Sequence, residues 1–194
     1  MWVNSIAKYL KIERQRLRFD AFLASYGGET FQIVSLPDLC HRVDKNLIKL
    51  PLDVCTFLGQ IGGRQEPDDI SRHLLRHSFD DWNLDKIITS TLEKYPETNL
   101  KALEQSLILS RYGSIAYKEM RCAYLHEGSP GINTHSFNLS ESRSRPTYLS
   151  GMYDTPPAIG FKVEFMLSIL KLCIDEFEKE ALSLEIDPIP ERFR

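Results

Sequence analysis

The chain has 194 residues, of which 42% are hydrophobic and 26% charged, and it carries a formal net charge of -3 at neutral pH. These values are typical of one folded domain or at most two small ones, and they exclude a collagen-like, low-complexity or wholly disordered chain. Because 24 basic residues are outnumbered by 27 acidic ones, there is no global positive field to attract polyanions, so any contact with nucleic acid must be local.

The four cysteines lie far apart in the sequence and include no C-x-x-C pair (Cys40, Cys55, Cys122 and Cys173). This spacing fits neither a zinc knuckle nor the disulfide framework of a small secreted protein, so we expect reduced and mostly buried thiols. The sequence predicts no metal site and no other cofactor. It also shows no signal-peptide pattern and no run of about 18 apolar residues, so we expect a cytoplasmic protein that does not interact with membranes.

Apolar residues recur at helical spacing over residues 3–25, and Gly27-Gly28 supplies the conformational freedom that commonly ends a helix. A short extended stretch is expected over residues 31–34. Three further helices are predicted to begin at prolines, each soon followed by an acidic residue that suits the positive end of the helix dipole (Pro37, Pro51 and Pro67). Residues 59–63, which contain three glycines, are expected to separate two of these helices.

Asn83 is expected to cap a helix that ends before Pro96, because the residue preceding a proline is disfavoured in the helical conformation. Thr98 or Asn99 then begins a long central helix. Its apolar stripe continues to about His126, after which a glycine and a proline act as stop signals.

Residues 128–157 are rich in Ser, Thr, Gly, Pro and Asn and contain two short runs of alternating type, at 135–139 and 147–149. We expect a small hairpin or a mobile loop in this excursion. Apolar residues return to helical spacing over 158–184. The predicted fold class is therefore mainly α: a single helical domain over residues 1–194, with long N-terminal, central and C-terminal helices, several short helices and one β-like excursion.

The strongest candidates for catalytic residues lie at the end of the predicted central helix: Arg121 and His126. An arginine fork fits the non-bridging oxygens of a phosphodiester and stabilises charge that develops on them. A histidine titrating near neutral pH can take a proton from a ribose 2′-hydroxyl or give one to the leaving oxygen. RNA cleavage by this route needs no metal.

The sequence resembles the HEPN superfamily, all-helical domains whose ribonuclease members carry an arginine and a histidine separated by four to six residues. Arg121 and His126 match that motif, with four residues between them, and the central helix, the excursion and the last helix resemble the family's architecture. The resemblance implies metal-independent RNA cleavage, in which Arg121 orients the scissile phosphate and His126 acts as acid or base. It also implies a homodimer that brings two motifs together and a role as a toxin or in antiviral defence.

In that family the residue after the arginine is usually polar, whereas here it is Cys122, a departure that bears on catalysis more than on the fold. Four residues near the motif are candidates for binding the substrate (Tyr124, Glu127, Arg143 and Arg145). The tyrosine could stack on a base or bond a phosphate, and the two arginines of the excursion could reach a substrate near the histidine. Tyr112 and Tyr117 could act like Tyr124, although tyrosines at helical spacing are more often part of a core.

On a straight α-helix, Arg121 and His126 would point about 140° apart and lie about 7.5 Å apart along the axis. A shared site therefore requires the last turn to unwind, the arginine to reach across, or a second protomer to supply one partner. Arg72 and His77 match the same spacing in a more polar segment and are the alternative pair.

Two other interpretations stay open. Positive residues in a last helical turn can simply satisfy the terminal carbonyls and the helix dipole, with Glu119 or Glu127 pairing the arginine. The chain would then be a non-catalytic helical interaction or nucleotide-binding protein that keeps a HEPN-like bundle.

Overall fold

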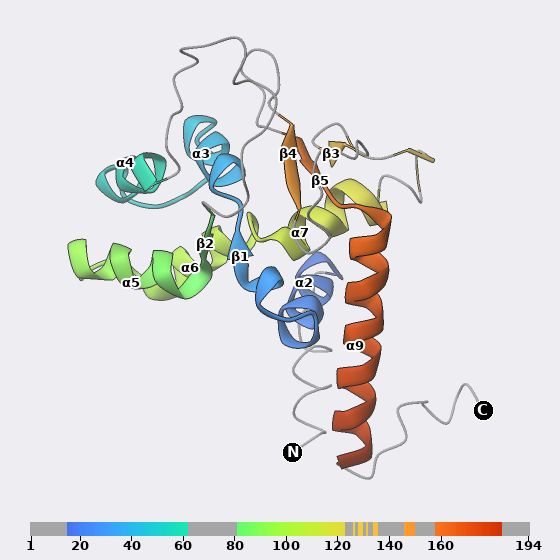
Figure 1. Cartoon of the computed structure of the whole chain (residues 1–194). Helices are drawn as coiled ribbons and strands as arrows, with labels where there is room; N and C mark the ends of the chain where they lie inside the picture. Colours follow the sequence, from blue (N-terminus) through green and yellow to red (C-terminus); the bar gives the residue numbers. More distant parts are fainter. Residues whose placement is uncertain are drawn as a thin grey trace.

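The computed structural model describes residues 15–61, 81–122, 126, 128–129, 131, 134–135, 146–149 and 158–183 (Figure 1). The α-helices of these residues are α2 (Gln15–Tyr26), α3 (Leu36–Asp44), α4 (Leu52–Ile61), α5 (Leu84–Lys94), α6 (Leu100–Ile108), α7 (Tyr112–Ala116) and α9 (Val163–Ser183). A 3-10 turn, η1 (Glu29–Gln32), and a π-helical segment, η4 (Tyr117–Cys122), accompany them. The strands are β1 (Ile33–Val34), β2 (Trp82–Asn83), β3 (Thr134–His135), β4 (Thr147–Leu149) and β5 (Ala158–Gly160). The fold is mainly α, as the sequence predicts.

Three helix starts follow the capping chemistry of the sequence. The Ser35 hydroxyl accepts a hydrogen bond from the Asp38 amide at 3.3 Å, with a proline in the first turn of α3. The side chains of Asn83 and Asn99 cap α5 and α6 in the same way, each accepting from an amide three residues on, at 2.8 and 2.9 Å. Each cap satisfies one of the backbone donors that a helix start leaves open, which explains why these boundaries are predictable.

Two short segments of the N-terminal half differ from the prediction. Gly59 lies inside α4, which continues to Ile61, so the helix is not broken at this glycine. Isolated glycines are tolerated within helices at a cost of about 1 kcal/mol, and here Val43 of α3 packs 3.6 Å from the position a Cβ would take. Of the stretch predicted as extended, only Ile33–Val34 is a strand. The helix start predicted at Pro67 lies outside the described residues.

The prediction of one long central helix is wrong. The helix α6 ends at Ile108, and the chain is extended at Arg111, with φ -67° and ψ 150°, before α7 begins. The extended residue bridges Val34, and the Ser110 carbonyl accepts a hydrogen bond from the Ser35 amide at 2.8 Å. At residues 110 and 111 the backbone therefore pairs with the segment around β1 instead of forming helical hydrogen bonds. The apolar periodicity alone predicts that the helix continues through these residues.

The excursion is not a hairpin between its two predicted runs. In a three-stranded sheet, β5 lies in the middle, parallel to β3 and antiparallel to β4. The central strand was predicted as the start of the last helix, which begins instead at Val163. The partners in β3 and β5 are 25 positions apart in the sequence, and those in β4 and β5 are 9 to 13 positions apart. The excursion therefore forms its antiparallel pair with the strand that follows it, which the sequence pattern predicts as helix.

The buried side chains form two clusters. One cluster joins α2, α7, β5 and α9 around Tyr112 and Phe165. The other joins α3, α4, α5 and α6 around Leu58 and Leu103. Figure 1 shows the second group of helices on one side of the molecule and α9 on the other, with α7 between them.

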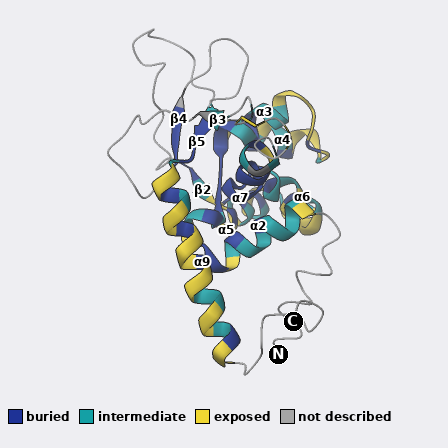
Figure 2. Cartoon of the chain, turned by 90° about the vertical axis from the view of Figure 1, so that its right-hand side faces the viewer, coloured by how far each residue is buried: buried dark blue, intermediate teal, exposed yellow. Residues whose placement is uncertain are grey.

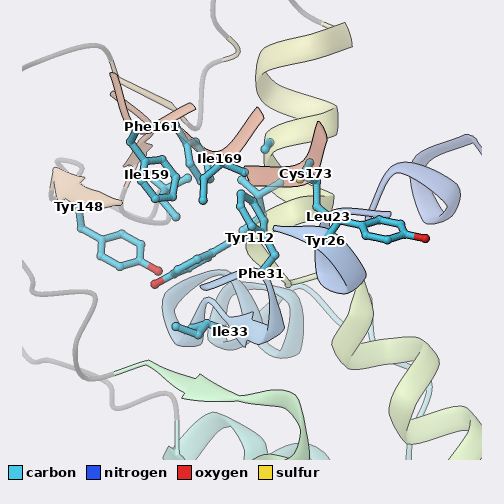
Figure 3. Packing of buried hydrophobic residues seen from close by; sticks show 13 residues of the cluster. Leu23, Tyr26, Phe31, Ile33, Tyr112, Tyr148, Ile159, Phe161, Ile169 and Cys173 are labelled. Atoms are coloured by element: carbon cyan, nitrogen blue, oxygen red, sulfur yellow. The ribbon is translucent and has the colours of Figure 1, made fainter. Parts of the chain in front are cut away.

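A buried polar network connects the two clusters. The Asp81 carboxylate accepts hydrogen bonds from the Tyr112 hydroxyl at 2.5 Å, from the Tyr148 hydroxyl and from the Leu36 amide at 3.1 Å. The Tyr148 hydroxyl also lies 2.8 Å from the Ser35 hydroxyl. Figure 3 shows that the hydroxyls of the two tyrosines point toward one another. Burial, reinforced by the negative charge nearby, raises the pKa of Tyr148 well above its usual value, so this phenol stays protonated and donates.

Replacing Tyr148 by Phe removes a donor from Asp81 and keeps the ring in the core. We expect the free energy of unfolding to fall by about 1–3 kcal/mol, because a buried carboxylate loses a partner that water cannot replace. Chemical denaturation followed by circular dichroism measures the change. The control is Tyr95→Phe at the half-buried end of α5, expected to change stability by less than about 0.5 kcal/mol. Equal effects of the two variants would contradict the role of the network.

All four cysteines are free thiols, with Cys40 and Cys173 buried and Cys55 and Cys122 half-buried. Burial raises the pKa of Cys173 from 9.0 to about 11, which lowers its reactive thiolate fraction at pH 8 about 100-fold. Because the folded pKa is the higher one, the contribution of this thiol to stability is full below about pH 9 and is lost as the pH rises through 11.

We therefore expect iodoacetamide at pH 8 to alkylate Cys173 at least about 100-fold more slowly than Cys55 in the folded protein. In denaturant the two rates should become equal. Peptide mapping by mass spectrometry measures both rates. Fast labelling of Cys173 without denaturant would show that this face of α9 is not packed into the core as described.

Candidate functional site

The helix that carries Arg121 is anchored at its first residue. The Tyr117 hydroxyl donates to the Gln15 side chain at 3.1 Å, and its ring lies 5.4 Å from the ring of Phe19. Both partners belong to α2, so one face of η4 is fixed against the N-terminal helix. Tyr112 and Tyr117 are buried at 0% and 9% exposure, which places both in the core rather than at a base-stacking surface.

A buried ion pair holds α7, from which η4 continues. The Arg111 guanidinium donates to the carboxylate of Asp20 in α2, and both side chains are almost fully buried. Burial raises the pKa of Asp20, and the attraction of Arg111 opposes that rise. On the other side of the carboxylate, a Cβ on Gly113 would lie only 2.8 Å from Asp20 Oδ1, so the glycine permits the close approach of α7 to α2. The ion pair between Arg111 and Asp20 thus fixes the start of α7 against α2, and η4 with Arg121 follows directly from α7.

Beyond Ala116 the helix is wound differently. Residues Tyr117–Cys122 form a π-helical segment, in which hydrogen bonds run from one residue to the fifth along the chain. The backbone of Arg121 lies within this segment. Residues five positions apart come close to the same face of a π turn, whereas on an α-helix they diverge. The segment ends at Cys122, and His126 lies beyond it.

His126 is exposed, and the chain turns back soon after it. Gly128 has φ 70°, a left-handed conformation that glycine adopts without a steric penalty. Three residues later the Gly131 amide donates to the Glu119 carbonyl at 2.7 Å. The turn therefore folds back onto η4 and leads directly into β3, which begins at Thr134.

Gly131 fits against Glu119 only because it lacks a side chain. A Cβ at this position would lie 2.1 Å from Glu119 Oε2 and 3.1 Å from its Cα. The carboxylate is buried at 6% side-chain exposure and forms an ion pair with the half-exposed Lys118, so it has little room to yield. Glu119 is one of the two residues that the sequence predicts as a partner of Arg121, and in the structure it pairs with Lys118.

The structure does not describe the side chains of the remaining predicted site residues. The side chain of Arg121 lies outside the described residues, as do the four candidates for binding the substrate (Tyr124, Glu127, Arg143 and Arg145). The alternative pair, Arg72 and His77, also lies outside them. What the described residues show is the winding of the helix at Arg121, the exposure of His126 and the turn that follows.

The turn supplies a test with two matched glycines. We expect Gly131→Ala to lower the free energy of unfolding by about 1–3 kcal/mol, because the new methyl group collides with a buried side chain. We expect Gly128→Ala to cost about 1 kcal/mol for its positive φ alone, since a Cβ there would meet no described atom within 4 Å. Urea titrations of both variants measure the difference. A neutral Gly131→Ala would mean that the turn does not pack on Glu119.

The residues that the structure describes contain no group of three or more His, Cys, Asp and Glu side chains that could hold a metal ion. None of their helices is long and apolar enough to cross a bilayer.

The polar residues that organise this region are not predictable from the sequence. Asp20, Gly131 and Asp81 carry no local motif, because their partners lie far away in the sequence. Comparison with protein-family models, curated proteins and solved structures finds nothing that this chain matches.

Proposed function

We propose that this chain is a HEPN-like, metal-independent endoribonuclease in which Arg121 orients the scissile phosphate and His126 transfers the proton. The proposal is carried by the π winding at Arg121, followed by the exposed His126. On a straight α-helix the two side chains would diverge, and the helix departs from regular α winding where it reaches Arg121. Segments of this type are often found at functional sites.

The chemistry follows from the two side chains. A ribose 2′-hydroxyl loses its proton and attacks the adjacent phosphorus, while the bond from phosphorus to the 5′-oxygen breaks and that oxygen gains a proton. The products are a 2′,3′-cyclic phosphate and a 5′-hydroxyl. His126 performs one of the two proton transfers, and Arg121 stabilises the charge that develops on the non-bridging oxygens.

The charge balance of the chain limits the kind of RNA contact. With a formal charge of -3, the protein does not bind polyanions indiscriminately, so binding depends on cations near the motif. Arg143 and Arg145 of the excursion and a second protomer are the proposed sources of further contacts. A role as a toxin or in defence belongs to the same proposal.

His126→Ala should lower RNA cleavage by at least about 100-fold, because general acid-base catalysis typically contributes that much or more. The assay uses purified protein with EDTA present, and the cyclic phosphate ends are identified by mass spectrometry. Arg121→Lys should also lose activity, because lysine keeps the charge but lacks the bidentate fork.

The matched control is His77→Ala, purified in the same way, which should cleave like the parent protein. The reverse result, with loss of activity only in His77→Ala, would move the site to the second pair. If the parent protein fails to cleave RNA, or if His126→Ala cleaves as fast as the parent, the proposal is wrong. The first of these outcomes would favour the non-catalytic helical protein.

A further inference from the structure

The last helix, α9, is apolar on two faces, and only one of them is covered. Its buried face contributes Phe165, Ile169 and Cys173 to the core. A second set of apolar residues is exposed, at 68%, 59%, 55% and 54% (Val163, Leu167, Leu170 and Ile174). Figure 2 shows exposed residues along most of the length of this helix. We call these four residues the α9 stripe.

The spacing of the α9 stripe is that of a helix-pairing seam. Its residues are separated by four, three and four positions, the pattern in which side chains of two helices interlock as knobs into holes. They cover about 16 Å of the helix axis. The stripe ends at Ile174, because Ala181, two turns further on the same face, is buried at 3% exposure.

The order of these separations is the same in both directions along the helix. An antiparallel copy can therefore place its Ile174 opposite Val163 and its Leu170 opposite Leu167, and the same contacts recur with the copies exchanged. A surface that matches itself in this way is what a two-fold symmetric interface requires.

The charges beside the α9 stripe favour the antiparallel arrangement. Glu164 and Lys171 are both exposed and lie along the same flank of the stripe, seven residues apart. An antiparallel copy brings its Lys171 opposite Glu164 and its Glu164 opposite Lys171, which gives two pairs of opposite charge. In a parallel copy the two flanks that carry these charges would lie on opposite sides of the seam, so neither charge would meet its opposite.

We propose that α9 pairs with α9 of a second copy of this chain, antiparallel, through Val163, Leu167, Leu170 and Ile174. The pairing does not rest on the proposed ribonuclease activity, and its test measures mass rather than cleavage. A second copy of the chain is the partner whose apolar spacing and flanking charges match those of the α9 stripe.

Sedimentation equilibrium of the full chain tests this pairing. The average mass should rise with concentration from 22.4 kDa toward twice that value. The variant Leu167→Lys/Leu170→Lys should stay at 22.4 kDa at all concentrations, with an unchanged circular dichroism spectrum and Tm. The control is Leu182→Lys on the same helix, which is 71% exposed but about 90° round the axis from the stripe, and it should associate like the parent.

A charge exchange keeps the test independent of the apolar variant. Lys171→Glu should weaken association by placing two carboxylates opposite each other, and Glu164→Lys should do so with two ammonium groups. The double variant Glu164→Lys/Lys171→Glu should restore association to within about threefold of the parent, because it recreates both pairs. Failure of the double variant to recover would rule out the antiparallel register.

The parent protein staying at 22.4 kDa at every concentration would overturn the proposal. If a monomer were found and Leu170→Lys lowered its Tm, the stripe would be covered by another part of the same chain. If the parent were a monomer and Leu170→Lys left its Tm unchanged, the stripe would be a binding surface for a different protein. Association of Leu167→Lys/Leu170→Lys as tight as that of the parent would overturn the proposal as well.

Discussion

The carboxylate of Asp81 is the contact on which the rest of the fold depends. It lies just before β2 and accepts hydrogen bonds from the start of α3, from α7 and from β4. An isolated buried carboxylate is expensive, and three donors from different parts of the chain make this one tolerable. Because each donor is supplied by a different segment, the helices α3 to α6 and the cluster around α9 have one relative position that satisfies them all. A purely apolar interface between the two clusters would impose no such requirement.

Local chemistry in the sequence was enough to place most helices. Asn83 caps a helix at the predicted residue, and Asn99 is one of the two residues predicted to begin the next, since a cap requires only a side chain and an amide three positions away. The errors came where a distant partner decides the conformation. Arg111 is extended because it pairs with Asp20 and bridges Val34, and Ala158–Gly160 is a strand because two other strands flank it. Apolar periodicity carries no information about either partner.

The candidate site was predictable in its residue types and not in its geometry. The motif of Arg121 and His126 is visible in the sequence, yet the spacing on an ideal helix argues against a shared site. The π winding of Tyr117–Cys122 is a departure from ideal helix geometry at Arg121 that the residue types do not indicate. Gly131 is a similar case. Glycine is required there because Glu119 packs against it, and the sequence alone does not indicate that contact.

The short strand β5 has a consequence for how two regions of the molecule move. Its backbone is paired with β3, which follows the turn after His126, and only two residues separate it from the first residue of α9. The turn after His126 and the first residue of α9, Val163, are therefore held to the same short strand. The three residues of β5 thus fix where the chain leaves the motif and where the apolar stripe begins.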